Sequence, residues 1–379
     1  MRAEVLGIGT ELLLGQIENS NARWISERLA EVGVDVLRHE VVGDNLERIT
    51  EAFERALARA DVVIATGGLG PTQDDITREA LAAATGMRLV RRPEIETALR
   101  ARFEEMGRRI YALPGVPAEM REMMEGTVLR ELRELVGSST IASRILRCVG
   151  MAESRVAELL DDLFLGSTNP TVAFLAGGGE VKVRITAKAE DHDRARTLIE
   201  PLVERALQRL GDVVFSTEDE DLAHVVGRLL VERSSTIAAA ESLTGGGLAR
   251  RLSWAEGASA FFLGSAVCYS AEAKISVLGV SPSTIEGPGP VSEACAREMA
   301  TGARRLFSAD VGISTTGVAG PEAHGGEPPG TVWVGLDADG VSFARLLRAP
   351  GGRELVRAWS TMAALDLVRR QLLGLPLPA

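Results

Sequence analysis

Several residue types are scarce in this sequence, and each shortage excludes a class of protein. The 379 residues include only 3 cysteines, far apart and with no CxxC spacing, so a disulfide framework is not expected; they are predicted to be small buried hydrophobes in a reducing cytoplasm. Four scattered histidines argue against a His-rich metal site. No apolar run reaches the roughly 20 residues that a membrane span needs, and no signal-peptide pattern follows Met1.

Lysine is as rare as cysteine, although arginine is abundant. The chain has 3 lysines and 39 arginines, which indicates that most lysine positions have been replaced by arginine and gives each remaining lysine special interest. The net charge of −11 opposes binding to a nucleic-acid backbone. With 45% hydrophobic and 25% charged residues the chain is typical of a globular protein, and its length predicts two or three domains.

The hydrophobic pattern divides the chain into three segments. Residues 1–150 alternate strands and helices, which predicts a mostly parallel sheet with sites at the strand C-termini. Residues 151–216 show a helix, a glycine-turned hairpin and a long helix, typical of a small α+β module. Residues 217–379 begin after an acidic linker and return to alternating strands and helices, so the whole chain is expected to be α/β.

A glycine-rich turn in the third segment, residues 240–247 (AESLTGGG), follows an apolar strand and precedes a helical stretch. A serine hydroxyl at such a turn is exposed, and the unpaired amides of a helix N-terminus could hold a phosphate or an oxyanion. The plainer interpretation is that Ser242 and Thr244 only cap the helix and that the glycines only permit the turn.

Lys274, in the segment 271–274 (AEAK), favours the catalytic interpretation. Lysine can lose its proton when it is desolvated, whereas arginine effectively cannot. A general base for a serine nucleophile needs that property. An ordinary surface lysine would more often be arginine in this chain, so we expect Lys274 to be the base for Ser242.

The motifs AESLTGGGLA, YSAEAK, GPVSE, TTGVAGP and PPGTVWVG follow one another between residues 236 and 340, and together they resemble the C-terminal domain of the CinA (competence/damage-inducible protein A) family. The resemblance implies a cofactor-free deamidation of nicotinamide mononucleotide to the acid, with release of ammonia. It implies Ser242 as nucleophile, Lys274 as base, and Ser259 and Tyr269 as supporting hydroxyls. The turn and the resemblance together predict substrate contacts from Thr244, Gly245, Gly246, Thr316 and one phosphate-binding arginine, either Arg353 or Arg357.

A second glycine-rich turn, Thr66 to Thr72 (TGGLGPT), follows the apolar strand DVVIA in the first segment. Glycines at a strand C-terminus let backbone amides approach an anion, and the adjoining Asp74 and Asp75 are placed to bind a divalent cation or a hydroxyl group. The two aspartates could equally be partners of the dipole of the following helix.

The stretches GIGTELLLGQIENSNARWI, TGGLGPTQDDITREAL and LPGVPAEM resemble the molybdopterin-binding (MoaB/MogA-like) domain of CinA proteins. The resemblance implies a three-layer N-terminal domain that hydrolyses ADP-ribose with a divalent metal (Mg, Mn or Co), a KH-like middle module and a C-terminal α/β deamidase domain. It also implies that the protein is a homodimer. The implied metal and substrate contacts are Glu11, Asn19, Asp74 and Asp75, with the phosphate held by Gly67, Gly68, Gly70 and Thr72.

One departure from the family pattern affects the N-terminal site. Residues 103–110 run directly into 111–120, where relatives usually carry a few dozen more residues that help to form the pocket. The alternative to a two-activity enzyme is a non-catalytic pterin- or nucleotide-binding module that acts through partners in competence or DNA repair. The chain shows no basic stripe or aromatic nucleic-acid platform that would support this alternative.

Overall fold

The computed structural model describes residues 1–70, 72, 75–87, 101–105, 108–136, 140–165, 168–338 and 340–378. The chain divides into two compact units, Met1–Ala142 with Thr186–Leu198, and Ser143–Ile185 with Ile199–Ala379. No helix among these residues is both long and apolar enough to cross a membrane.

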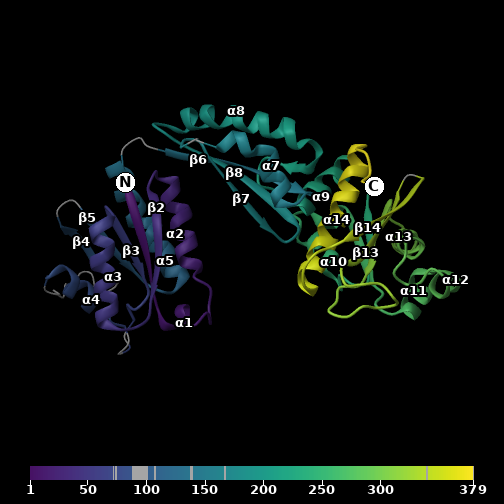
Figure 1. Cartoon of the computed structure of the whole chain (residues 1–379), viewed down its shortest axis with the longest axis horizontal. Coiled ribbons are helices and arrows are strands. Elements are labelled where there is room, and N and C mark those ends of the chain that lie inside the picture. The colour runs from purple at the N-terminus through teal and green to yellow at the C-terminus, as the bar shows by residue number, and fades with distance from the viewer. Residues whose placement is uncertain are drawn as a thin grey trace. The chain divides into compact units, whose positions relative to one another are not determined.

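The N-terminal unit contains a five-stranded sheet in the order β2-β1-β3-β5-β4. Its strands are β1 (Arg2–Ile8), β2 (Asp35–Val42), β3 (Val62–Thr66), β4 (Ala101–Glu105) and β5 (Arg108–Leu113), parallel except for β4. One face is covered by α2 (Ser20–Glu31), α5 (Pro117–Met123), a π-helix (Met124–Val128) and α6 (Leu129–Val136), the other by α3 (Leu46–Arg59) and α4 (Thr77–Thr85) (Figure 1). The short α1 (Thr10–Leu13) follows β1. The expected three-layer domain is confirmed.

The middle module has a four-stranded sheet in the order β7-β8-β6-β9. Its strands are β6 (Thr140–Val149), β7 (Thr171–Gly177), β8 (Glu180–Ala189) and β9 (Val214–Ser216). The helices of this segment are α7 (Glu153–Phe164) and α8 (His192–Leu210), followed by the 3-10 turn Gly211–Val213. The α+β composition expected for this module is confirmed, and its first strand begins before residue 150.

The C-terminal sheet has the order β11-β10-β12-β13-β14. The strands β10 (Ile237–Glu241), β11 (Phe262–Val267) and β12 (Val311–Gly317) are parallel, and β13 (Thr331–Ala338) and β14 (Val341–Arg348) continue the sheet antiparallel. The helices are α9 (Leu222–Glu232), α10 (Gly247–Trp254), a 3-10 turn (Ala258–Ala260), α11 (Ala271–Leu278), α12 (Pro282–Glu286), α13 (Glu293–Phe307) and α14 (Arg353–Leu373). The carboxyl ends of β10, β11 and β12 therefore meet at one edge.

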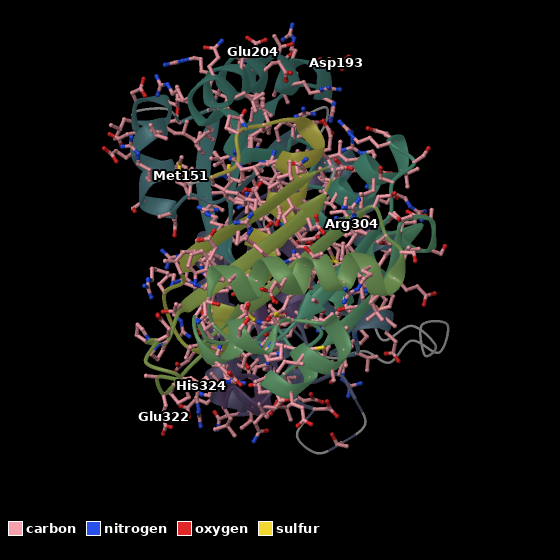
Figure 2. The ribbon with its side chains drawn as sticks, turned by 90° about the vertical axis from the view of Figure 1, so that its right-hand side faces the viewer. Met151, Asp193, Glu204, Arg304, Glu322 and His324 are labelled. Atoms are coloured by element: carbon pink, nitrogen blue, oxygen red, sulfur yellow. The ribbon has the colours of Figure 1, made fainter. Side chains whose placement is uncertain are left out.

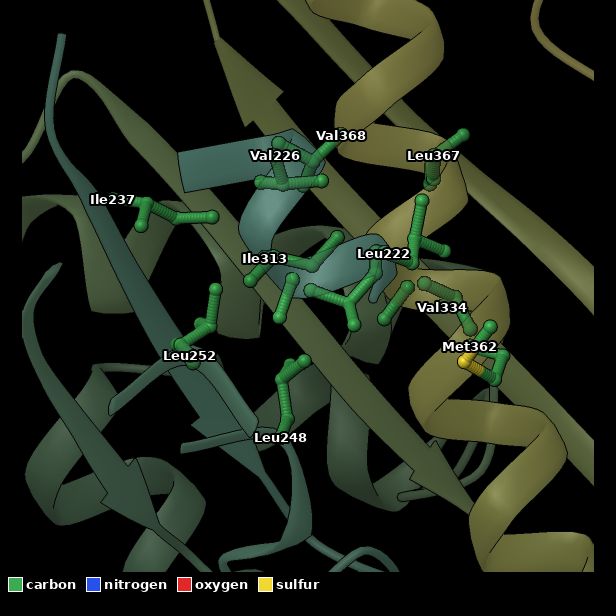
Figure 3. Close-up of a cluster of buried hydrophobic side chains, with 14 of the residues drawn as sticks. Leu222, Val226, Ile237, Leu248, Leu252, Ile313, Val334, Met362, Leu367 and Val368 are labelled. Carbon is green, nitrogen blue, oxygen red and sulfur yellow. The ribbon is translucent and has the colours of Figure 1, made fainter. Parts of the chain in front are cut away.

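The main core of this domain lies between the sheet and the helices α9, α10 and α14. Figure 3 shows Leu222, Leu248 and Met362 reaching from these three helices toward the sheet residues Ile313 and Val334. All of these side chains are almost completely buried. Burial of large aliphatic side chains contributes roughly 1.5–3 kcal/mol each, so this layer fixes the helices that surround the edge of β10.

The opposite face of the sheet is covered by α11 and α13, and Figure 2 shows α13, which carries Arg304, lying across it. Two glycines of the sheet allow this helix to come close. A Cβ added to Gly312 would lie 2.1 Å from the Ala300 carbonyl oxygen, and one added to Gly335 would lie 2.2 Å from that of Ala296. These obstacles are helix backbone and cannot rotate away.

We predict that Gly335→Ala lowers the thermal stability of the C-terminal domain, because overpacking typically costs about 1–3 kcal/mol and here the helix itself must move. Differential scanning calorimetry of the full chain measures the effect. Gly177→Ala is the matched control, since Gly177 has no positive φ and a Cβ there meets nothing within 4 Å. Equal transition temperatures for the two variants would contradict this account of the packing.

Candidate active site

The turn after β10 carries Ser242 at the carboxyl edge of the sheet. The Ser242 amide donates to the Thr315 carbonyl of β12 (2.9 Å), which ties the turn to the neighbouring strand. Gly245 and Gly246 both have positive φ, 57° and 93°, a conformation that other residues adopt only with strain. A Cβ on Gly245 would in addition lie 2.8 Å from the Arg357 guanidinium. Both glycines are thus required by the shape of the turn.

Ser242 and Lys274 meet inside the domain. Lys274, on the first turn of α11, is only 3% exposed, and its Nζ donates to the Ser242 hydroxyl oxygen at 3.3 Å. Ser270 begins this helix, its hydroxyl accepting from the Ala273 amide (3.1 Å). The predicted proximity of the serine and the lysine is therefore present in the structure.

The surroundings of Lys274 favour its neutral form. Burial lowers the pKa of the Lys274 ammonium, against a smaller opposing influence of the thiols of Cys295 and Cys268. Burial also raises the pKa of Cys295 to about 11 and raises that of Cys268. Both thiols are consequently uncharged near neutral pH and give the lysine no anion to pair with. All three cysteines of the chain are free and buried, as expected.

Glu241, the residue before Ser242, is fully buried and turns back onto the start of α10. Its carboxylate accepts hydrogen bonds from the amides of Gly246 (2.9 Å), Leu248 (3.0 Å) and Ala249 (2.8 Å). The hydroxyl of Ser265 on β11 donates to the same carboxylate at 3.0 Å. The expectation that the amides of this helix N-terminus are free for a phosphate is wrong, because an internal acid already occupies them.

Two amides of the turn remain available. Within the part of the chain that the structure describes, no acceptor is bonded to the backbone N–H of Leu243 or Thr244. By contrast, the amide of Gly245 donates to the Ser242 carbonyl. Free donors directly after a nucleophile are the groups that an oxyanion requires. The candidate oxyanion site thus precedes the helix.

Three threonine hydroxyls near the turn are engaged with protein groups. The hydroxyls of Thr244 and Thr315 lie 2.7 Å apart, and the fully buried Thr316 donates to the Pro290 carbonyl at 2.6 Å. Thr316 thereby fixes the loop before α13 to the end of β12. Its predicted contact with substrate phosphate stays a prediction.

The two candidate arginines lie on the first turns of α14 but make different contacts. Arg353 donates to the Tyr269 hydroxyl (3.0 Å) and to the Gly320 carbonyl (2.9 Å), so it reaches loops that follow β11 and β12. Arg357 donates to the Thr244 carbonyl (2.6 Å). Tyr269 is 61% exposed. Ser259 is exposed in the 3-10 turn and makes no bond with Ser242 or Lys274 among the described residues.

Glu241 and Ser265 are not among the site residues predicted from the sequence. No local signal marks either residue, because Glu241 folds back onto amides five to eight positions further along the chain and the contact of Ser265 crosses between two strands.

The N-terminal glycine turn borders a separate cavity of about 460 Å³, lined by Glu11, Asn19, Gly67, Gly68, Gly70, Asp75 and, beyond those predicted, Asn21, Asp44 and Glu119. A Cβ on Gly67, whose φ is 107°, would lie 2.1 Å from the Ile8 carbonyl oxygen, so only glycine fits there. Asn19 caps α2 by accepting from the Ala22 amide (3.2 Å).

The fit of a metal ion to this cavity is incomplete. Carboxylate oxygens suit a hard cation, but the Asp75 carboxylate already accepts from the Thr72 amide (2.9 Å) and hydroxyl, bonds that lower its pKa. Among the described residues, no group of three or more acidic, histidine or cysteine side chains could hold a metal ion. Asp74 lies outside the described residues. The described side chains therefore do not form a metal site by themselves.

Comparison with known proteins matches each part of the chain to a family model. Residues 4–134 match a probable molybdopterin-binding domain, residues 143–216 the KH domain of damage-inducible protein CinA, and residues 219–372 the CinA C-terminal domain. The fold and the site thus define a three-module protein with an N-terminal molybdopterin-binding-type domain.

Several relatives match this chain over nearly its whole length. A CinA-like protein of Frankia casuarinae is 44% identical over 421 positions, covering 99% of this chain and 97% of its own. One from Dictyoglomus thermophilum is 40% identical over 412 positions, covering 99% and 100%. A crystal structure of a competence-damaged protein (CinA) superfamily protein from Klebsiella pneumoniae has 37% identity and a TM-score of 0.40, over 40% of this chain and 96% of that one. The chain belongs to the CinA-like family.

This chain is shorter than its alignment with the Frankia protein. The alignment runs over 421 positions, whereas this chain has 379 residues, so that relative carries residues that this chain lacks. That these residues belong before residue 111 stays a prediction.

Proposed function

We propose that the C-terminal domain deamidates nicotinamide mononucleotide, giving nicotinate mononucleotide and ammonia. The observation that carries the proposal is the buried contact between Ser242 and Lys274. A lysine that burial holds toward its neutral form can accept the proton of a serine hydroxyl. The substrate follows from the family resemblance, since the pair itself specifies only hydrolysis of an amide or a related acyl group.

The reaction proceeds by acyl transfer. Lys274 takes the hydroxyl proton as the Ser242 oxygen attacks the carboxamide carbon, and the resulting oxyanion is bound by the free amides of Leu243 and Thr244. Collapse of this intermediate breaks the C–N bond, and Lys274 returns the proton to the leaving nitrogen, which departs as ammonia. Water, activated by Lys274, then attacks the ester, releasing the carboxylic acid and restoring the Ser242 hydroxyl.

Arg353 is the better placed of the two candidate phosphate ligands. It extends toward the loops after β11 and β12 through Tyr269 and Gly320, at the strand ends where Ser242 also lies. Tyr269 keeps its hydroxyl at this edge, where it can orient the substrate. Arg357 is directed to the Thr244 carbonyl instead.

For the N-terminal cavity we propose binding of ADP-ribose, with the pyrophosphate near Gly67, Gly68 and Gly70. The close approach of backbone at these glycines and the polar lining of the cavity support this assignment. A divalent metal held with the help of Asp74 and Asp75 belongs to the same proposal. The homodimer and the cytoplasmic location stay predictions.

The competing proposal is a non-catalytic nucleotide- or pterin-binding protein of competence or DNA repair. The molybdopterin-binding match of residues 4–134 is the observation that favours it. Ammonia release from nicotinamide mononucleotide by the full chain separates the two, since a binding module releases none.

We predict that Ser242→Ala lowers the deamidation rate by about 10³-fold or more, because it removes a covalent nucleophile. Ammonia release measures this. Ser276→Ala is the control: its exposed hydroxyl on α11 donates to the Glu272 carbonyl, and the variant keeps the full rate. If Ser242→Ala retained more than about a tenth of the rate, Ser259 or a water molecule would be the nucleophile.

We predict that kcat/KM rises with pH through a limb set by Lys274. The neutral lysine is the active form, and burial lowers its pKa, so the limb lies below the ordinary value of 10.5. Lys274→Arg and Lys274→Met are both nearly inactive, since neither supplies a base. The same exchange at Lys182, paired with Asp219 on the surface at 3.2 Å, leaves the pH profile unchanged. Substantial activity of Lys274→Arg would show that only positive charge is needed.

We predict that the full chain binds Mn²⁺ or Co²⁺ detectably but hydrolyses ADP-ribose poorly. The resemblance implies that this chain lacks residues that form part of the cavity wall in relatives, and a more open cavity admits water, which weakens electrostatic contacts to a pyrophosphate. Calorimetry measures metal binding, which Asp75→Asn weakens and Glu54→Gln, an exposed exchange on α3, leaves unchanged. Efficient release of AMP from ADP-ribose would show that the missing residues are dispensable.

A further inference from the structure

A cavity of about 480 Å³ lies beside the nucleophile turn, and neither Ser242 nor Lys274 lines it. It is bounded by the first turns of α9 and α14 and by the length of α10. Its lining is mostly charged or aromatic, with His224, Arg250, Arg251, Trp254, Glu354 and Arg357 as the main side chains. A volume in this range suits a small organic ligand.

The arginines of this cavity differ in how far they are already neutralised. Arg251 is held by Asp221, with 2.5 Å between Nη2 and Oδ2, and by the Met362 sulfur. Arg250 is exposed, and its side chain makes no hydrogen bond or ion pair within the described residues. Arg357 donates one hydrogen bond from Nη2 to the Thr244 carbonyl, and it forms no ion pair among the described residues.

The remaining charges leave the cavity positive. Once Asp221 is paired with Arg251, Glu354 is the acid that faces two arginines, and no ion pair joins it to either among the described residues. His224 adds a ring nitrogen that can donate to an anion. Arginines with unused planar forks are suited to phosphate oxygens.

Trp254 gives the cavity an aromatic wall. It ends α10 and is 75% exposed, although a tryptophan normally buries most of its large surface. An exposed indole beside guanidinium groups that no carboxylate neutralises within the described residues suits a planar base stacked on the ring with its phosphate on the arginines. A sugar phosphate would leave the indole uncovered, and an apolar ligand would leave the arginines unpaired.

We propose that this cavity binds a nucleoside phosphate, with the base on Trp254 and the phosphate on Arg250 and Arg357, as a site separate from the Ser242–Lys274 pair. The site goes beyond the proposed deamidation and does not depend on it. The two sites share the turn at Thr244, which lines the cavity and whose carbonyl accepts a hydrogen bond from Arg357.

The test titrates AMP, ribose 5-phosphate and inorganic phosphate into the full chain and follows tryptophan fluorescence and heat. AMP quenches the fluorescence and binds at least tenfold more tightly than ribose 5-phosphate. Trp254→Phe removes the quenching and weakens AMP but not ribose 5-phosphate. Arg250→Ala weakens AMP and ribose 5-phosphate by about tenfold or more, as expected for a lost charge-assisted contact. Arg233→Ala, an exposed arginine at the far end of α9, changes nothing.

Three results would overturn the proposal. The first is the absence of quenching by AMP, and the second is equal affinity for AMP in Arg250→Ala and the unchanged chain. The third is a KM for nicotinamide mononucleotide that rises in Arg250→Ala as much as the AMP affinity falls, which would make the cavity part of the deamidase pocket. Binding is measured without turnover, so a chain that releases no ammonia contradicts the proposed function and leaves this test intact.

Discussion

The carboxylate of Glu241 organises the C-terminal site. It lies at the end of β10 without any exposed surface and satisfies three amides of α10 together with the Ser265 hydroxyl. Burying a carboxylate costs free energy unless such partners surround it. The same bonds give acceptors to three amides that would otherwise have none. These hydrogen bonds connect the end of β10 to the start of α10 and to β11. They thereby fix the position of Ser242, the next residue in the chain.

The second constraint is the close approach of the covering helices to the sheet. β10 consists largely of alanine, and Gly312 and Gly335 let α13 approach the neighbouring strands closely. α13 and α11 share one core with Ala238 and Ala240, and Lys274 extends from α11 toward the same strand. Small residues in the sheet are thus what brings a lysine from a helix to a serine at a strand end.

Much of this architecture could be predicted from the sequence, because the spacing of hydrophobic residues distinguishes strands from helices. The pairing of Ser242 with Lys274 could also be predicted, since lysine is rare here and each residue belongs to a recognisable motif. The occupation of the α10 amides could not, because a turn sequence does not show whether a neighbouring acid folds back. Likewise, the different directions of Arg353 and Arg357 depend on how α14 packs, which no local pattern encodes.

The scarcity of lysine has a practical consequence for chemical modification. Lys274 is 3% exposed, so an amine-directed reagent meets, besides the α-amino group, only Lys182 and Lys188, whose side chains are 33% and 36% exposed. Both lie on β8, six residues apart along one strand. Dyes or cross-linkers that react with lysine side chains will therefore attach along a single strand of the middle sheet, and the α-amino group is the other amine that such a reagent meets.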